Sequence, residues 1–299
     1  MRGSWPSRVL KSFEMLSVVI ATIGGPELEG TIRRLNEGSV RPDEILVCLP
    51  AGSHDRAASV QGENVRVRIC DSKGQVPQRA EGFTQVAGEL VLQLDDDIAL
   101  DYDCLGRLRD ALEKLHGKAA VAPMMLDQAS ATSVYKREMT LKRKLFFALL
   151  NGREGFQPGQ VTKSGFGMGV QSEDIPEGTL QVGWLPGGCA LHRKENLVSH
   201  NFFPFPGKAF CEDLMHSAEL RSCGVSLHMV AGAHCRLDAA PVFPTSFSGA
   251  WREFQADMRA RMYYLRKYAR PSGRIAFYAA ARASHLAAAL MRSGFPAHR

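Results

Sequence analysis

The sequence has no long hydrophobic segment and no glycine-rich nucleotide-binding motif. Its most apolar late stretch, residues 275–291, is interrupted by Arg282 and His285, so we predict no membrane-spanning helix. No apolar segment follows the basic residues near the N-terminus, which argues against a secretory signal peptide. The motifs GxGxxG and GxxxxGK(S/T) are both missing, which argues against a Rossmann dehydrogenase or a P-loop enzyme. The missing signal peptide and membrane span predict a cytoplasmic protein.

The sequence also lacks the cysteine patterns of disulfide frameworks and zinc sites. The seven cysteines are scattered, and none forms a CxxC pair: Cys48, Cys70, Cys104, Cys189, Cys211, Cys223 and Cys235. We interpret them as reduced thiols of a cytoplasmic protein, several of them buried in strands. A zinc site is the alternative, although its spacing matches no zinc signature. It would combine Cys211, Cys223, His228, His234 and Cys235.

Basic charge is concentrated at the C-terminus. The chain has a net charge of +6, but residues 251–299 contain ten Lys or Arg and two Asp or Glu, a net of +8. The other 250 residues therefore carry a net charge of −2. A domain without excess positive charge argues against a nucleic-acid-binding protein. A basic tail indicates a local anionic partner, such as the inner face of a membrane.

The basic tail, residues 241–299, also has an amphipathic pattern. Apolar residues recur at helical spacing, with basic residues between them: Trp251, Phe254, Met258, Met262 and Leu265, interleaved with Arg252, Arg259, Arg266 and Lys267. We expect a basic helix that either packs on the preceding domain or lies on an anionic inner-membrane surface. In the second case the protein would be peripheral on the inner face of the cell membrane.

Strands and helices alternate over the first 123 residues. Apolar strand patterns occur at 16–21, 45–49, 65–69, 90–94 and 119–122, and helical patterns at 28–35, 76–86 and 105–115. This alternation with short connections predicts an α/β fold, in which a Rossmann-like, mostly parallel sheet has helices on both faces.

The rest of the chain is less regular. Residues 140–150 suggest a short helix, and the segment 154–175, rich in Gly, Ser and Gln, suggests a mobile loop or lid. We expect these parts: a loose extension over 1–14, a large domain over 15–240 with halves 15–123 and 124–240, and the helical tail over 241–299.

Three consecutive acids, Asp95, Asp96 and Asp97, follow the strand predicted at 90–94. Adjacent carboxylates repel one another, and hard oxygen ligands of this kind suit Mg²⁺ or Mn²⁺ bound with a diphosphate. The alternative is an acidic loop or a helix N-cap. Ligands of parallel α/β sheets bind outside the carboxyl ends of the strands, so polar residues at these ends should share one crevice. The others are Thr22, Asp71 and the loop after Leu49.

Several segments together resemble the family-2 glycosyltransferases, which have the GT-A nucleotide-sugar fold. The resemblance covers residues 15–240, and it rests on the order and spacing of motifs that are individually weak. These are Ser17–Thr22 and Pro42–Val47 as the first two strands, Gly74, Arg79 and Gly82 with Ala87-Gly88-Glu89, the LDDDI run at Leu94–Ile98, Gly187-Gly188 with Arg193, and Glu212-Asp213 with Arg221 and Gly224. Two departures leave the base of the donor open. Leu49-Pro50 replaces the family's acidic pair, and Ser72 and Ala80 replace two asparagines.

The resemblance implies an inverting enzyme that transfers a sugar from a nucleotide-sugar donor, with a UDP-sugar as the first candidate, to a glycan or lipid-linked acceptor. A divalent cation, Mn²⁺ or Mg²⁺, would be the cofactor. Asp97 would bind the metal, because it is the outermost of the three acids. Asp213 would be the general base that accepts the proton of the acceptor hydroxyl, and Glu212 is the second choice. A simple N-cap at the start of a helix is the alternative for Asp213.

The resemblance also suggests roles for the remaining residues. The donor-binding candidates are Thr22, Asp71, Arg79, Asp95 and Asp96, the further metal or diphosphate contact is His234, and the acceptor-side candidates are Trp184, Gly187 and Gly188. Each has a structural alternative: a strand-end cap for Asp71, a solvated helix face for Arg79, a structural histidine at 234, and a tight turn at the two glycines.

Two other functions remain open from the sequence. A nucleotidyltransferase that makes activated sugars would need a basic glycine-rich loop after the first strand, but Gly24-Gly25-Pro26 has no Lys or Arg before Arg33. A non-catalytic scaffold of a glycan-assembly complex would explain Leu49-Pro50. The intact acidic run and Glu212-Asp213 argue against such a scaffold.

Overall fold

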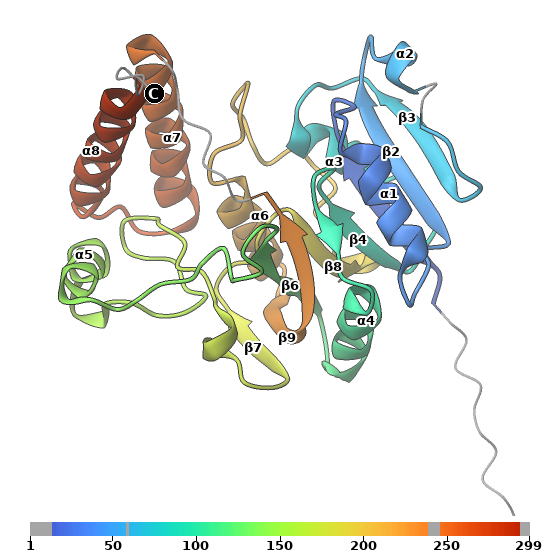
Figure 1. Cartoon of the computed structure of the whole chain (residues 1–299), viewed down its shortest axis with the longest axis horizontal. Coiled ribbons are helices and arrows are strands. Elements are labelled where there is room, and N and C mark those ends of the chain that lie inside the picture. The colour runs from blue at the N-terminus through green and yellow to red at the C-terminus, as the bar shows by residue number, and fades with distance from the viewer. Residues whose placement is uncertain (1–13, 58–59, 239–245, 294–299) are drawn as a thin grey trace, which may run out of the picture.

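The computed structural model describes residues 14–57, 60–238 and 246–293, which are coloured in Figure 1. Most of the expected N-terminal extension, and the parts of the tail at 239–245 and 294–299, lie outside these residues. In Figure 1 the first strands and helices are on the right, and the last two helices are on the left.

A nine-stranded sheet with the strand order β3-β2-β1-β4-β8-β6-β9-β5 forms the centre, and β7 pairs with β9. The strands are β1 (Leu16–Ala21), β2 (Glu44–Pro50), β3 (Val65–Cys70), β4 (Leu90–Leu94), β5 (Ala99–Leu100), β6 (Ala119–Asp127), β7 (Thr179–Val182), β8 (Cys189–Arg193) and β9 (Ser226–Leu237). Strands β1 to β4 are parallel to one another, whereas β8 is antiparallel to both β4 and β6. The predicted α/β fold with a mostly parallel sheet is confirmed.

Helices cover both faces of the sheet. They are α1 (Leu28–Glu37), α2 (His54–Ala57), α3 (Gln75–Phe83), α4 (Cys104–Lys114), α5 (Leu141–Asn151), α6 (Glu212–Ser222), α7 (Phe247–Tyr268) and α8 (Ile275–Ser293). Side chains alternate along β1: Val18 and Ile20 join the core beneath α1 and α4, and Val19 joins the core beneath α3. Because both faces are covered, every residue of β1 is buried, and all of them except Ser17 are apolar.

The segment expected to be a mobile lid, residues 154–175, is anchored to the protein at several points. Met168 and Val170 are buried, and Val161 forms an isolated β-bridge with Gly167. Movement of this segment as a lid stays a prediction.

The C-terminal tail is a pair of helices, α7 and α8, rather than one helix. Tyr264 and Leu265 of α7 are buried in a second core, with residues of α6 and β9. The structure therefore supports packing on the preceding domain for the C-terminal half of the predicted apolar stripe. At its other end, Trp251 remains 51% exposed. None of the helices in the described ranges is long and apolar enough to cross a membrane.

Asp257 of α7 is the centre of a buried ionic network. Its carboxylate accepts hydrogen bonds from Arg261 at 3.0 Å and from the Tyr278 hydroxyl of α8 at 2.7 Å, and Arg282 lies 3.3 Å away. The Cys211 thiol, directly before α6, contacts the same carboxylate at 3.9 Å. The network therefore ties α7 and α8 together and connects both helices to the start of α6.

We predict that Asp257→Ala destabilises the protein by about 3–5 kcal/mol, because it leaves the buried Arg261 cation without its partner. The free energy of unfolding in urea measures this effect. The matched control is Glu154→Ala, which breaks the exposed Lys163–Glu154 pair and should cost about 1 kcal/mol or less. Equal effects of the two substitutions would contradict a structural role for the network.

Candidate active site

The three acids after β4 have three different environments. The Asp95 amide donates to the Gly188 carbonyl at 2.8 Å, which continues the pairing of β4 with β8. Asp96 accepts a hydrogen bond from the buried Thr22 hydroxyl at the end of β1. Asp97 is exposed. The structure thus brings Thr22 together with the acidic run, and it directs only Asp97 outward.

Arg79 of α3 connects the acidic run to α6. It is only 3% exposed, and its guanidinium lies 2.9 Å from Asp95 Oδ1 and 3.4 Å from Glu212 Oε2. Gln75, one turn earlier on α3, donates to the same Asp95 oxygen at 2.8 Å. The solvated helix face considered for Arg79 is therefore wrong. One buried cation joins carboxylates from β4 and α6.

Burial is the main influence on the pKa values of these acids. It raises the pKa of both Asp95 and Glu212, and the positive charge of Arg79 opposes the rise in each case. Burial also raises the pKa of Asp213 to about 6. At Asp97, loss of hydration and the charges of Asp95 and Asp96 raise the pKa. Asp213 is thus a carboxylate whose proton affinity suits a base near neutral pH.

The start of α6 has a strained backbone. Helix α6 begins at Glu212, and the preceding N-cap residue, Cys211, has a left-handed conformation with φ 58°. Asp213 lies inside the first turn, where its Oδ1 accepts from the Leu214 amide at 2.8 Å. The simple N-cap considered for Asp213 is therefore wrong, because Cys211 occupies that position.

Gly187 and Gly188 make room for the carboxylates. A Cβ atom added to Gly187 would lie 2.4 Å from Glu212 Oε1, and one added to Gly188 would lie 3.2 Å from Asp95 Oδ2 and 2.5 Å from the Ile98 side chain. Neither glycine has a positive φ. The preference for glycine here is consequently spatial: a side chain at either position would displace the Glu212, Asp95 or Ile98 side chain from its present place.

Three other candidates contact residues outside the group of Arg79, Asp95 and Glu212. Trp184 is buried in the second core and donates to the Met168 carbonyl at 3.2 Å. The His234 carbonyl accepts from the Asp101 amide, so His234 lies at the opposite end of β5 from Asp97. Asp71 is the first residue after β3. The cap of this strand end is Glu81, whose carboxylate accepts from the amides of Asp71 and Ser72.

The zinc site considered from the cysteines does not assemble. Across the described part of the chain, no three His, Cys, Asp or Glu side chains are grouped so that they could hold a metal ion. Cys223 is exposed, whereas Cys235 is buried in the main core. The same result means that the acidic run does not form a preassembled site with His234.

Two glutamines of α3 contribute to the site although they belong to none of the sequence motifs. Besides Gln75, the buried Gln78 donates to the carbonyls of Thr22 and Cys48 at 2.9 and 2.8 Å and joins the ends of β1 and β2. Their spacing with Arg79 places the three side chains on one helix face. A polar face on a helix that covers an apolar sheet is the sequence signal that could have revealed them.

Comparison with solved structures finds proteins of similar fold. A crystal structure of GalNAc-T7 with UDP, GalNAc and Mn²⁺ matches with a TM-score of 0.54 and 14% identity, and the match covers 76% of this chain and 44% of that one. Two crystal structures of S. aureus TarS match with TM-scores of 0.48 and 0.46 at 14% and 15% identity. Each TarS match covers 95% of this chain, and they cover 73% and 44% of the TarS chains.

The chain thus spans less than half of the GalNAc-T7 chain that it matches. No protein-family model and no curated protein sequence matches it. At this level of identity the structural likeness shows the fold alone.

We predict that Arg79→Gln destabilises the protein in a pH-dependent manner. Without the cation, the folded-state pKa values of Asp95 and Glu212 should rise further above their unfolded values. A raised carboxyl pKa lowers stability as the pH increases, since the folded state then holds a proton more tightly than the unfolded state. The decrease in the free energy of unfolding caused by Arg79→Gln should therefore be small near pH 4 and reach about 3–5 kcal/mol near pH 8.

Thermal unfolding followed by circular dichroism across this pH range tests the prediction. The control is Arg41→Gln, which breaks the exposed Arg41–Glu63 pair and should change Tm little at any pH. A loss in Arg79→Gln that does not vary with pH would show that the carboxylates do not depend on Arg79.

Proposed function

We propose that this protein is a glycosyltransferase that transfers a sugar from a nucleotide-sugar donor to a glycan or lipid-linked acceptor. The observation that carries the proposal is the link through Arg79 between the acidic run of the donor-side sheet and the Glu212-Asp213 pair of α6. It brings a candidate metal-binding carboxylate and a candidate base into one region of a GT-A fold. Residues 15–240 would form the catalytic domain.

The acids fit a divalent cation that arrives with the donor rather than a resident metal. Asp97 is exposed, whereas Asp95 and Asp96 are each engaged by another side chain. Mg²⁺ typically binds through one or two carboxylates together with substrate phosphates, and such a set needs no closed protein site. Asp97 would hold Mn²⁺ or Mg²⁺, and the bound cation would neutralise charge on the leaving diphosphate.

Asp213 would act as the general base. The acceptor hydroxyl would give its proton to the Asp213 carboxylate while its oxygen forms a bond to the anomeric carbon. The bond between that carbon and the diphosphate would break on the opposite side, and the anomeric configuration would invert. Arg79 would hold Asp95 and Glu212 in place, so that the donor and acceptor sides keep a fixed separation.

The donor side would be formed by Thr22, Asp95 and Asp96, with Asp71 at the neighbouring strand end. UDP is the first donor nucleotide to test, because the GalNAc-T7 structure contains UDP with Mn²⁺. In this chain Leu49-Pro50 is a buried part of β2. This segment therefore offers no carboxylate to the nucleotide base of the donor. Recognition of that nucleotide base would depend on other groups.

We predict that UDP binds with an affinity that depends on Mn²⁺ through Asp97. Calorimetry with Mn²⁺ and with EDTA should show binding tighter by about tenfold or more with the metal, and Asp97→Ala should remove this difference. The control is Asp103→Ala, which removes an exposed carboxylate paired with Arg107 on α4. Equal affinity of the unaltered protein with and without the metal would reject the role of Asp97.

We predict that Asp213→Asn lowers turnover by about two to four orders of magnitude, because the amide cannot accept the acceptor proton. Donor affinity and Tm should change little. Glu212→Gln should cost less turnover but should lower Tm, since Glu212 is a partner of Arg79. Glu219→Gln, at the other end of α6, is the control for effects on the helix. Near-normal turnover in Asp213→Asn would reject Asp213 as the base.

The role of Asp213 as the general base also predicts how turnover depends on pH. Turnover should fall as the pH drops below about 6, where the Asp213 carboxylate becomes protonated. The residual activity of Asp213→Asn should lack this acidic limb. Nucleotide-sugar binding without any turnover would instead favour the non-catalytic scaffold.

A further inference from the structure

Exposed apolar side chains are concentrated on one side of the molecule. Ten large apolar side chains are exposed in the described residues, and eight of them lie within 139–149 or 247–291. These segments contain α5, α7 and α8, which lie together on the left of Figure 1. The remaining two are Ile23 and Tyr102. A concentration of this kind marks an interaction surface rather than ordinary surface scatter.

Helix α5 has the most regular part of this surface. Leu141 is 84% exposed, Leu145 is 60% exposed and Leu149 is 38% exposed. Residues four apart lie on one helix face, so these leucines form a stripe along the whole helix. We call Leu141, Leu145 and Leu149 the leucine stripe. The opposite face of α5 is anchored, since Phe147 and Leu150 are buried and the Phe147 ring packs on Phe156 at 4.8 Å.

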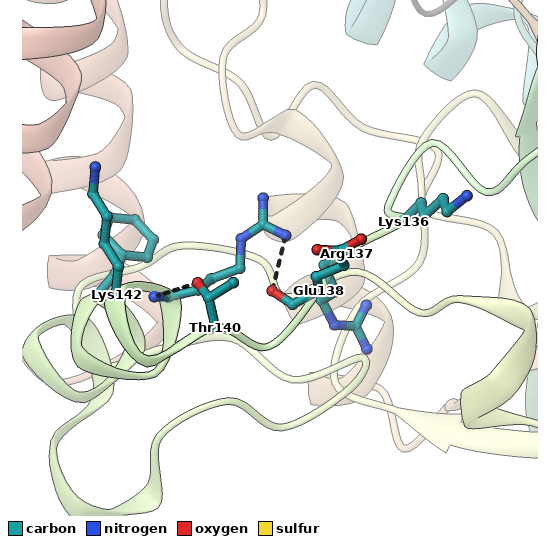
Figure 2. Close-up of a pocket in the computed structure, with 7 residues that line it drawn as sticks. Lys136, Arg137, Glu138, Thr140 and Lys142 are labelled. Carbon is teal, nitrogen blue, oxygen red and sulfur yellow. Dashed lines mark hydrogen bonds between the residues drawn. The ribbon is translucent and has the colours of Figure 1, made fainter.

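Basic residues flank the leucine stripe. Lys142, Arg143 and Lys144 are exposed, and residues 139–153 contain no Asp or Glu. Arg143 lies four residues before the buried Phe147 and donates to the Glu138 carbonyl at 3.4 Å, so Lys142 and Lys144 are the cations beside the stripe. Figure 2 shows the Lys142 side chain extending from the start of α5 and the Lys136 side chain extending from the segment that precedes α5, and neither ammonium group has a dashed line to the other residues drawn. The leucine stripe is therefore bordered by positive charge, and α5 has no carboxylate of its own to neutralise it.

The leucines and the cations together favour one partner. We propose that α5 lies flat on an anionic lipid bilayer, with the leucine stripe in the acyl boundary and Lys142 and Lys144 among the headgroups. A bilayer of anionic lipid accepts an apolar stripe and the cations beside it at the same time. The matching stripe on α7 is less available, because Tyr264 and Leu265 are buried in the second core. This surface is separate from the residues of the proposed transfer reaction. If the protein did not bind membranes, the proposed transfer reaction would be unaffected.

Vesicle flotation of the whole protein tests the proposal. At low salt, the unaltered protein should float with vesicles that contain anionic phosphatidylglycerol and should remain unbound with phosphatidylcholine alone. Raising the salt concentration should weaken the binding, because screening reduces the attraction of the exposed cations. A double substitution, Leu141→Glu with Leu145→Glu, should lower the partition coefficient by about tenfold or more. Both sites are exposed, and Tm confirms that the fold is retained.

Three further variants identify the contact. Lys142→Gln with Lys144→Gln should also reduce binding by several-fold, at positions where folding is not at risk. Phe247→Glu with Trp251→Glu, on the exposed end of α7, should have a smaller effect than the α5 pair. Tyr102→Glu, which is exposed on another part of the molecule, should bind as the unaltered protein does.

Two results would overturn the proposal. One is failure of the unaltered protein to float with anionic vesicles at low salt, which would favour a protein partner for the leucine stripe. The other is normal flotation of both α5 variants together with loss of flotation in the α7 variant, which would make α7 the membrane contact.

Discussion

A buried guanidinium is the interaction on which the candidate site depends. Arg79 lies between Asp95 and Glu212, which come from opposite halves of the sequence. Two carboxylates that approach one another in a poorly hydrated region repel, and neither can remain ionised without a nearby cation. Arg79 therefore joins β4 to α6 and compensates the negative charge of both acids.

The chain is built to permit this close approach. Gly187 and Gly188 have no side chain where a Cβ atom would collide with Glu212 or approach Asp95. Gln75 adds a second donor to Asp95, and Gln78 joins the ends of β1 and β2 on the same side of the sheet. The polar face of α3 thus organises the strand ends that would receive a donor.

The C-terminal helices support the start of α6. Asp257 on α7 binds Arg261 and the Tyr278 hydroxyl, and the Cys211 thiol touches the same carboxylate. Cys211 is held in a left-handed conformation immediately before Glu212-Asp213. Strain at such a position persists only where the surrounding structure holds it, and α7 provides contacts that do so. The tail is consequently a structural part of the site as well as a basic surface.

The sequence by itself determined the alternation of strands and helices, the strand that ends in the acidic run, and the location of Glu212-Asp213 at the start of a helix. These features follow from local periodicity and from the chemistry of neighbouring residues, which the order of amino acids contains directly. The helix predicted at 140–150 is also confirmed, as α5.

Only the tertiary structure decided which residues meet. It buried Arg79 between two acids instead of leaving it in solvent, placed His234 beside Asp101 rather than Asp97, and packed the end of the α7 stripe into a core while it left the leucine stripe of α5 exposed. An amphipathic pattern shows that a helix has an apolar face, but it does not show what covers that face. Contacts between residues more than a hundred positions apart depend on the packing of the whole chain, which no local pattern encodes.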